Sequence, residues 1–93
     1  MAAYLNDVAI TILEVKRIGR AVRGHFQVAA AQASSLQDCL ETDGQAYYRG
    51  AMDDQGQPRY VEVPVLLRKL EPQGQHYQGL FFAAAEPRDC PPD

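Results

Sequence analysis

Residues 22–30 read VRGHFQVAA and show the clearest two-residue alternation of apolar and polar side chains in the chain. Such alternation is typical of a β-strand with one buried and one solvated face. The preceding run, VAITILEVKR at 8–17, also begins with alternating β-branched residues, and Gly19 lies between the two runs. We therefore predict a β-hairpin over residues 7–32, with its turn at 18–21.

The apolar phase of the first run changes at Leu13. Val8, Ile10 and Ile12 follow one phase, whereas Leu13 and Val15 follow the other. A change of phase indicates either a β-bulge or a strand that is buried on both faces. We expect one of these two features near Leu13.

The second half of the chain contains three further strand-like runs. They are AYYRGAM at 46–52, RYVEVPVLLRKL at 59–70 and HYQGLFFAAA at 76–85, separated by the turn-forming sequences DDQGQP at 53–58 and EPQG at 71–74. Four apolar residues of the middle run share one predicted face: Val61, Val63, Val65 and Leu67. Pro64 has no N–H group, so we expect this strand to be at a sheet edge or kinked there.

One short helix is expected between the two hairpins. The sequence SLQDCLE at 35–41 places three apolar residues on one helical face, namely Leu36, Cys39 and Leu40. Ser34 or Ser35 can cap the first turn, and Gly44 suits the position just after a helix. We predict that this helix covers the sheet or plugs the end of a barrel.

These elements predict an α+β domain that is mainly β, with the order β-β-α-β-β-β. We expect five antiparallel strands in a small barrel or a curved sheet, with one short helix. In this prediction residues 1–86 form a single β-rich domain. Residues 87–93, which read PRDCPPD, form a flexible C-terminal tail.

The two hairpins resemble each other in sequence. Both first strands begin with three alternating β-branched residues and reach a basic pair, Lys16-Arg17 or Arg68-Lys69, and both return strands pass through Gly-x-Phe towards a run of alanines. Glycines inside the return strands, Gly24 and Gly79, are typical of small closed sheets in which a strand bends. Either the repeat is real, which favours a pseudo-symmetric barrel, or two hairpins rich in Val, Gly and Phe are alike by composition alone.

The composition is that of one small globular domain. The chain has 93 residues, of which 46% are apolar and 23% charged, and its formal net charge is −3. This charge argues against a general nucleic-acid or membrane-surface binder, so such a role would need a local basic patch. No apolar run is long enough to cross a bilayer, and the charged residues near the N-terminus argue against a secretory signal. We expect a cytoplasmic protein of bacterial type.

The sequence does not support catalysis or the binding of a metal or cofactor. Cys39 and Cys90 lie far apart, without a CxxC motif or a histidine at metal-ligand spacing, so we expect free thiols. Asp53 and Asp54 lie in a predicted turn, where aspartate bonds to the backbone. The chain contains no Gly-x-Ser-x-Gly motif and no glycine-rich phosphate loop. We therefore expect a protein that is not an enzyme, with no cofactor and no metal.

A basic cluster around the first predicted turn is the first candidate binding site, and it consists of Lys16, Arg17, Arg20 and Arg23. Positive charges at this density could bind phosphates or an acidic protein surface. They could equally keep the tip of the hairpin soluble and protect a strand edge.

Aromatic residues of the second half are interleaved with arginines, and they form the second candidate. The aromatic set is Tyr47, Tyr48, Tyr60, Tyr77, Phe81 and Phe82. We take Tyr48, Arg49 and Tyr60 as the binding residues, because aromatic and arginine side chains together bind single-stranded nucleic acid on OB-fold sheets. Packing in the core is the other explanation for the same residues.

Part of this region resembles the helix and last hairpin of bacterial single-stranded-DNA-binding proteins. The resemblance rests on the short helix, Gly44, Tyr48, Gly50 and the sequence DDQGQPRYVEV at 53–63. It implies an OB-like fold that binds single-stranded DNA. The first third of the chain is too short for the strands that this family requires, so we do not assign the chain to it.

Leu66 and Phe82 lie on the face opposite the buried stripe of their strands. Because a chain of this size cannot readily bury both faces of a sheet, we expect a protein partner or a second copy to cover the surface of the strands at 59–70 and 76–85. The function that we favour is a small, non-catalytic protein–protein interaction or regulatory module. The alternative is an OB-like single-stranded nucleic-acid-binding protein.

Overall fold

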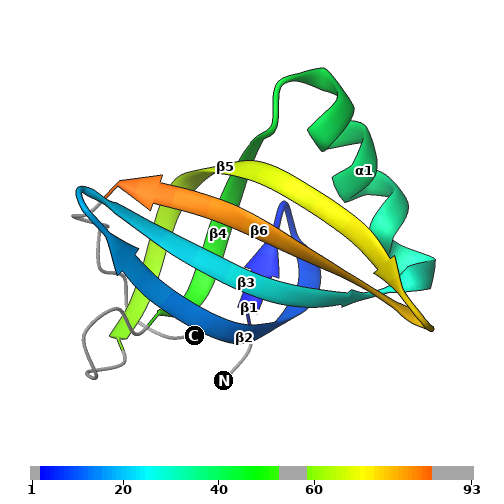
Figure 1. The fold of residues 1–93 in the computed structure, drawn as a ribbon, viewed down its shortest axis with the longest axis horizontal. Coiled ribbons are helices and arrows are strands. Elements are labelled where there is room, and N and C mark those ends of the chain that lie inside the picture. Colours follow the sequence, from blue (N-terminus) through cyan, green and yellow to red (C-terminus); the bar gives the residue numbers. More distant parts are fainter. Residues whose placement is uncertain (1–2, 53–58, 85–93) are drawn as a thin grey trace.

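A computed structural model describes residues 3–52 and 59–84 of the chain (Figure 1). The elements in chain order are β1 (Ala3–Leu5), β2 (Val8–Ile18), β3 (Ala21–Ala29), a 3-10 turn (Ala30–Gln32), α1 (Ala33–Thr42), β4 (Gln45–Met52), β5 (Arg59–Gln73) and β6 (His76–Ala84). The predicted turn at 53–58 and the predicted tail at 87–93 lie outside the described residues.

The strands form a closed antiparallel barrel in the order β1-β2-β3-β6-β5-β4, in which β1 pairs with β4 to complete the ring. This finding confirms the mainly β class and selects the barrel over the open sheet. The barrel has one strand more than predicted, because β1 is only three residues long, too short for a sequence pattern to indicate a strand. A tight turn joins β1 to β2 at Asn6 and Asp7, which both adopt positive φ angles, as two-residue hairpin turns require.

The first predicted hairpin is confirmed. β2 pairs with β3 around a turn at Gly19, whose φ is +60°, and the register shifts between Ile12 and Glu14. This irregularity accounts for the change of apolar phase at Leu13. β3 ends at Ala29 rather than at residue 32, because the chain then enters the 3-10 turn.

Helix α1 is longer at its N-terminus than predicted. It begins at Ala33 and is preceded by Gln32, which makes no side-chain capping bond, so the expected serine cap is wrong. The predicted end is confirmed, because Gly44 follows the helix with a φ of +75°. The helix packs against β5 and β4 and buries Leu36 completely in the barrel core.

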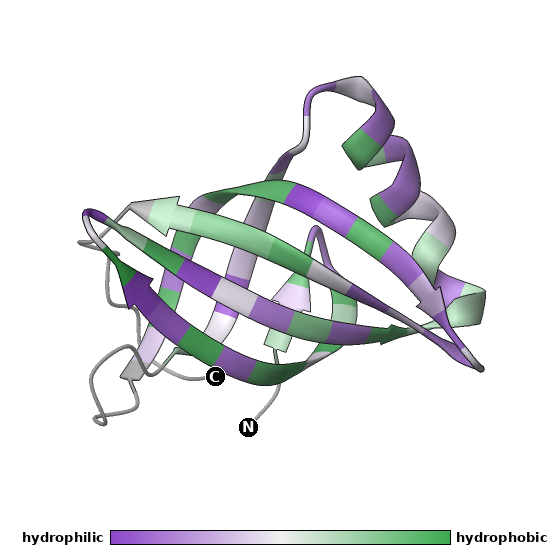
Figure 2. Ribbon diagram, in the orientation of Figure 1, coloured by the Kyte–Doolittle hydropathy of each residue, from purple (hydrophilic) through white to green (hydrophobic). Residues whose placement is uncertain are grey.

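The core follows from the alternation along each strand, which Figure 2 shows as changing bands of hydropathy along β2, β3 and β5. The predicted apolar face of β5 is buried over its whole length: Val61, Val63, Val65 and Leu67. Burial of large apolar side chains contributes about 1.5–3 kcal/mol each to folding, so this interior is the main stabilising feature.

Strand β5 has different neighbours along its length. β4 pairs with β5 from Arg59 to Leu66, whereas β6 pairs with it only from Val65 onwards. Pro64 therefore lies where β5 has a single neighbour, which agrees with the expected local edge.

The two hairpins form a structural repeat. β3 and β6 pair with each other, so that Gly24 faces Phe81, Phe26 faces Gly79, and His25 faces Leu80 at the centre. If β3 and β6 are exchanged, Gly24 takes the place of Gly79 and Phe26 that of Phe81, so each glycine still pairs with a phenylalanine. This relation defines an approximate twofold axis through the His25–Leu80 pair.

The irregularities of the hairpins obey the same symmetry. The register shift between Ile12 and Glu14 in the first hairpin lies opposite Phe26, and the shift between Leu67 and Lys69 in the second lies opposite Phe81. The turn glycines, Gly19 and Gly74, also correspond and have φ angles of +60° and +67°.

This register corrects one part of the sequence comparison. Lys16 pairs with Arg23 in the first hairpin, and the corresponding pair of the second is Glu71 with Gln78. The two basic pairs therefore do not match each other. Leu5 pairs with Tyr48 across the β1–β4 seam, which lies on the opposite wall of the barrel from His25 and Leu80.

Candidate binding surface

Four of the predicted binding residues lie in one row across the outside of the barrel. Lys16 pairs with Arg23, Arg23 with Phe82, Phe82 with Leu66, and Leu66 with Gln45, so that the row crosses β2, β3, β6, β5 and β4. We call this set the outer row. On β3, β6, β5 and β4 these residues alternate with buried neighbours, and Lys16 on β2 is itself exposed, so their side chains lie on the outer face. The structure therefore brings part of the basic cluster next to the predicted apolar surface.

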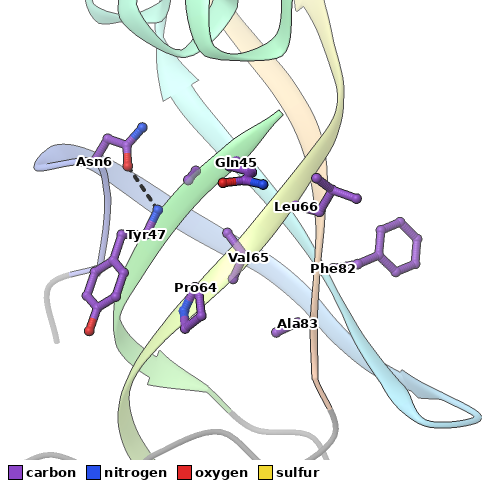
Figure 3. A pocket seen from close by; sticks show the side chains of 9 residues that line it. Asn6, Gln45, Tyr47, Pro64, Val65, Leu66, Phe82 and Ala83 are labelled. Carbon is purple, nitrogen blue, oxygen red and sulfur yellow. Dashed lines mark hydrogen bonds between the residues drawn. The ribbon is translucent and has the colours of Figure 1, made fainter. Parts of the chain in front are cut away.

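The apolar part of the outer row borders a groove of about 590 Å³ (Figure 3). Leu66 is 36% exposed, Phe82 is half-buried, and the two side chains extend from neighbouring strands. Tyr47, at 44% exposure, and Pro64 continue the lining across β4 and β5. A groove with several partly exposed apolar residues can receive an apolar side chain of another molecule.

Hydrogen bonds fix the Tyr47 side of this groove. The Tyr47 N–H donates to Asn6 Oδ1 over 2.9 Å, and the Asn6 N–H donates to the Tyr47 carbonyl over 2.9 Å. The Tyr47 hydroxyl donates to Glu62 Oε1 over 2.6 Å. Because both the backbone and the ring of Tyr47 are held, this wall is preformed before a ligand arrives.

The basic part of the outer row is exposed and weakly paired. Arg23 Nη2 lies 3.7 Å from Glu14 Oε1, a long contact between a partly exposed and an exposed side chain. Neither Lys16 nor Arg20 forms an ion pair with a described residue, and Arg17 and Arg20 are exposed at the β2–β3 tip. Exposed pairs contribute about 0–1 kcal/mol, so Lys16, Arg20 and Arg23 are available to a partner.

Arg49 and Tyr60 lie away from the outer row. The Arg49 guanidinium carbon lies 5.1 Å from the centroid of the Tyr4 ring, and Arg49 pairs in register with Glu62, four residue pairs along β4 and β5 from the Gln45–Leu66 pair. Together with Tyr47, these side chains border a second hollow of about 460 Å³. Tyr60 is half-buried two residue pairs further along β5 and pairs with Ala51.

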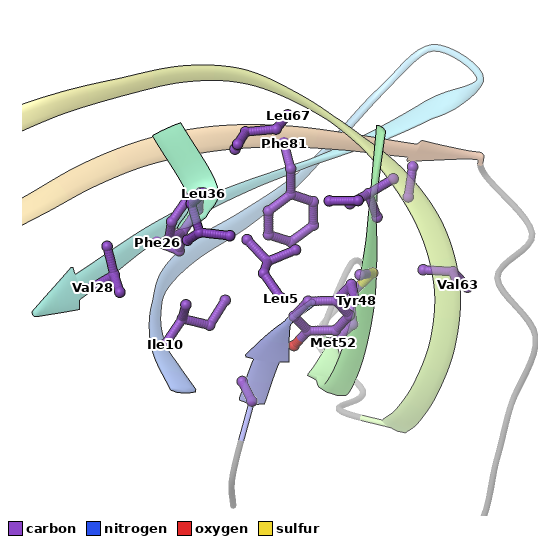
Figure 4. Close-up of a cluster of buried hydrophobic side chains, with 14 of the residues drawn as sticks. Leu5, Ile10, Phe26, Val28, Leu36, Tyr48, Met52, Val63, Leu67 and Phe81 are labelled. Atoms are coloured by element: carbon purple, nitrogen blue, oxygen red, sulfur yellow. The ribbon is translucent and has the colours of Figure 1, made fainter. Parts of the chain in front are cut away.

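Tyr48 is in the interior, so its predicted role in surface binding is wrong. Its side chain is fully buried, and its ring stacks on Phe81 at a centroid distance of 5.1 Å (Figure 4). Its hydroxyl donates a hydrogen bond to the Ala51 carbonyl. Burial raises the pKa of this hydroxyl above its ordinary value. A ring in this position packs the core and cannot stack on a base.

Seven of the nine residues that line the groove are not among the binding residues predicted from the sequence. Tyr47 belongs to the predicted aromatic set, whereas no pattern in the sequence predicts Asn6 or Pro64 as groove residues. The alternation Gln45-Ala46-Tyr47-Tyr48 would place either tyrosine inside, because both phases contain one aromatic residue. The small Ala46, in phase with Tyr48 and Gly50, is the signal that could have identified the buried tyrosine.

The described residues offer little reactive chemistry. Among them, no group of three or more His, Cys, Asp or Glu side chains is placed to hold a metal ion. The Cys39 thiol donates to the Gln45 carbonyl over 2.9 Å, and burial together with the Asp43 charge raises its pKa. A raised pKa favours the neutral thiol, which is the less nucleophilic form.

Two further findings complete the description of the chain. Within the part of the chain that the structure describes, no helix has the length and apolar character needed to cross a bilayer. Comparisons with protein-family models, curated proteins and solved structures find no match to this chain.

Proposed function

We propose that the protein is a small, non-catalytic interaction module that binds a protein partner through the groove beside Leu66 and Phe82. One observation carries the proposal: partly exposed apolar side chains from adjacent strands converge on a preformed groove, although the barrel interior already holds a full set of apolar residues. Leu66 and Phe82 lie outside this interior and remain partly exposed to water. Surface apolar groups that border a groove are a common feature of protein-binding sites.

A second copy of the chain is one partner that this groove fits. A symmetric dimer would place the same groove of each copy face to face and would remove Leu66 and Phe82 from water. Light scattering over a concentration series distinguishes this arrangement from binding to a different protein.

The experiment that tests the proposal is site-directed crosslinking. A photoreactive phenylalanine analogue at position 82 should crosslink a specific protein in lysate of the source cells, and Leu66→Glu should abolish the product. The matched control carries the same analogue at Leu13, which is 44% exposed on β2 and does not line the groove. Equal products from the two positions, or none from position 82, would reject the proposed function.

Binding of single-stranded nucleic acid is the second candidate. It is supported by the pairing of Arg23 with Phe82 on the outer face, because a cation beside an aromatic ring can bind a phosphate and stack on a base. The buried position of Tyr48 and the net charge of −3 count against it. Titration of a labelled oligo(dT) tests this candidate directly.

A further inference from the structure

The outer row has a basic half and an apolar half. Lys16 and Arg23 occupy β2 and β3, and Phe82 and Leu66 occupy the next two strands in register. Neighbouring strands lie about 4.8 Å apart, so the distance from the backbone at Lys16 to that at Leu66 is about 14 Å. An extended peptide covers this distance in about four to five residues.

We propose that the outer row recognises a protein segment in which acidic residues and apolar residues lie about four positions apart. This inference rests on the proposed function and specifies the chemistry of the partner. The apolar side chains of the segment cover Leu66 and Phe82, and its carboxylates face Lys16 and Arg23. Arg17 and Arg20 at the hairpin tip extend the positive field beyond the row.

Glu14 supports the charge preference of this surface. Its carboxylate lies 3.7 Å from Arg23, which shows that a carboxylate can occupy the space beside that guanidinium. The contact is long and Glu14 is 61% exposed, so a partner carboxylate can replace it at little cost. Glu14 is thus a competitor for the basic half of the row.

The inference is tested with a fluorescein-labelled peptide, DDESGLF, in which three acidic residues precede Leu and Phe. Fluorescence anisotropy should show that it binds at least about tenfold more tightly than KKKSGLF or DDESGSS. The double variant Lys16→Gln, Arg23→Gln should lower the affinity for DDESGLF by about tenfold. Added salt should also lower the affinity of the parent protein for this peptide. Glu14→Gln should tighten binding by about two- to threefold, because it removes the competing carboxylate.

Lys69→Gln is the matched control for charge. Lys69 is also exposed on the outer face, but its ammonium already lies 2.9 Å from Glu71 Oε1. Lys69→Gln should alter peptide affinity by less than about twofold, whereas the single variant Lys16→Gln, which changes the net charge by the same amount, should weaken binding more. Leu66→Glu should abolish peptide binding, and thermal melts of each variant show whether the barrel remains folded.

Three results would overturn the inference. The first is equal binding of the acidic and basic peptides, the second is tighter binding of oligo(dT) than of DDESGLF, and the third is a dimer that Leu66→Glu dissociates. If the peptides show no charge preference while crosslinking at position 82 still depends on Leu66, only this inference fails. If the crosslink does not depend on Leu66, the proposed function fails as well.

Discussion

Gly24 lies directly opposite Phe81 across the β3–β6 ladder, and the Phe81 ring covers the space where a side chain at Gly24 would be. A β-carbon at Gly24 would lie 2.2 Å from Phe81 Cζ. The symmetric pair has the same arrangement, because a β-carbon at Gly79 would lie 2.7 Å from Phe26 Cζ and 2.4 Å from the Lys69 carbonyl oxygen. Each half of the barrel therefore supplies a phenylalanine that packs over a glycine of the other half.

Gly24→Ala should destabilise the barrel by about 1–3 kcal/mol, the usual cost of overpacking a filled core. The Phe81 ring cannot move away easily, because it also packs against the Tyr48 ring and its centroid lies 5.9 Å from the centroid of the Phe26 ring. Gly79→Ala should cost at least as much, since its closest neighbour is a backbone atom. Urea unfolding monitored by circular dichroism measures both changes.

Gly19→Asn is the control for these variants. Gly19 has a positive φ, and no heavy atom of the described residues lies within 4 Å of the position that its β-carbon would occupy. Asparagine tolerates such backbone angles, so the free energy of unfolding should change by less than about 1 kcal/mol. A loss at Gly19 as large as that at Gly24 would contradict the packing explanation.

Tyr48 should make the barrel less stable at alkaline pH. Burial raises the pKa of its hydroxyl in the folded state, whereas the unfolded chain should have a value of about 10. The folded state therefore holds this proton more tightly. The resulting stabilisation is fully present below about pH 10 and is lost as the pH rises through the folded-state pKa.

Tyr48→Phe isolates this effect from the titration of lysines and of exposed tyrosines. The variant should lose about 1 kcal/mol at neutral pH, because the hydrogen bond to the Ala51 carbonyl is removed. Its stability should then fall less steeply than that of the parent above about pH 10. Parallel pH dependences in urea titrations would show that Tyr48 ionises as an ordinary exposed tyrosine.

Most of the barrel could be predicted from local patterns. The alternation in β3 and β5 identifies their buried faces, and the change of phase at Leu13 marks the irregularity between β2 and β3. These features depend only on residues close in sequence, which is why the pattern suffices. β1 was missed because three residues cannot show a period.

The outer row could not be predicted in the same way. Its members come from five strands, and their alignment depends on the register between strands that are distant in sequence. That register is determined by the two bulges and by the closure of the ring, neither of which is encoded in the spacing of the basic or aromatic residues. The sequence therefore identified Arg23, Leu66 and Phe82 individually without showing that they are neighbours.

Leu66→Glu should remove partner binding while leaving the fold intact. The side chain is on the outer face, so the charge remains in water and the free energy of unfolding should change by less than about 1 kcal/mol. Leu36→Ala provides the contrast, because it empties a fully buried site and should cost about 2–5 kcal/mol. If Leu66→Glu unfolds the barrel in thermal melts, Leu66 serves stability and not recognition.

Binding to generic single-stranded DNA at physiological salt should be weak or absent. The net charge of −3 opposes approach, and Glu14 lies beside Arg23 on the strand pair that carries the basic tip. If the tip were a nucleic-acid site with about six phosphate contacts, the logarithm of the affinity for oligo(dT) would fall with the logarithm of salt concentration at a slope of about −4. Replacement of Arg17, Arg20 and Arg23 by Gln would then flatten that slope. A dissociation constant in the micromolar range or tighter, with this salt dependence and with loss of binding on Phe82→Ala, would make nucleic acid the ligand of the outer row.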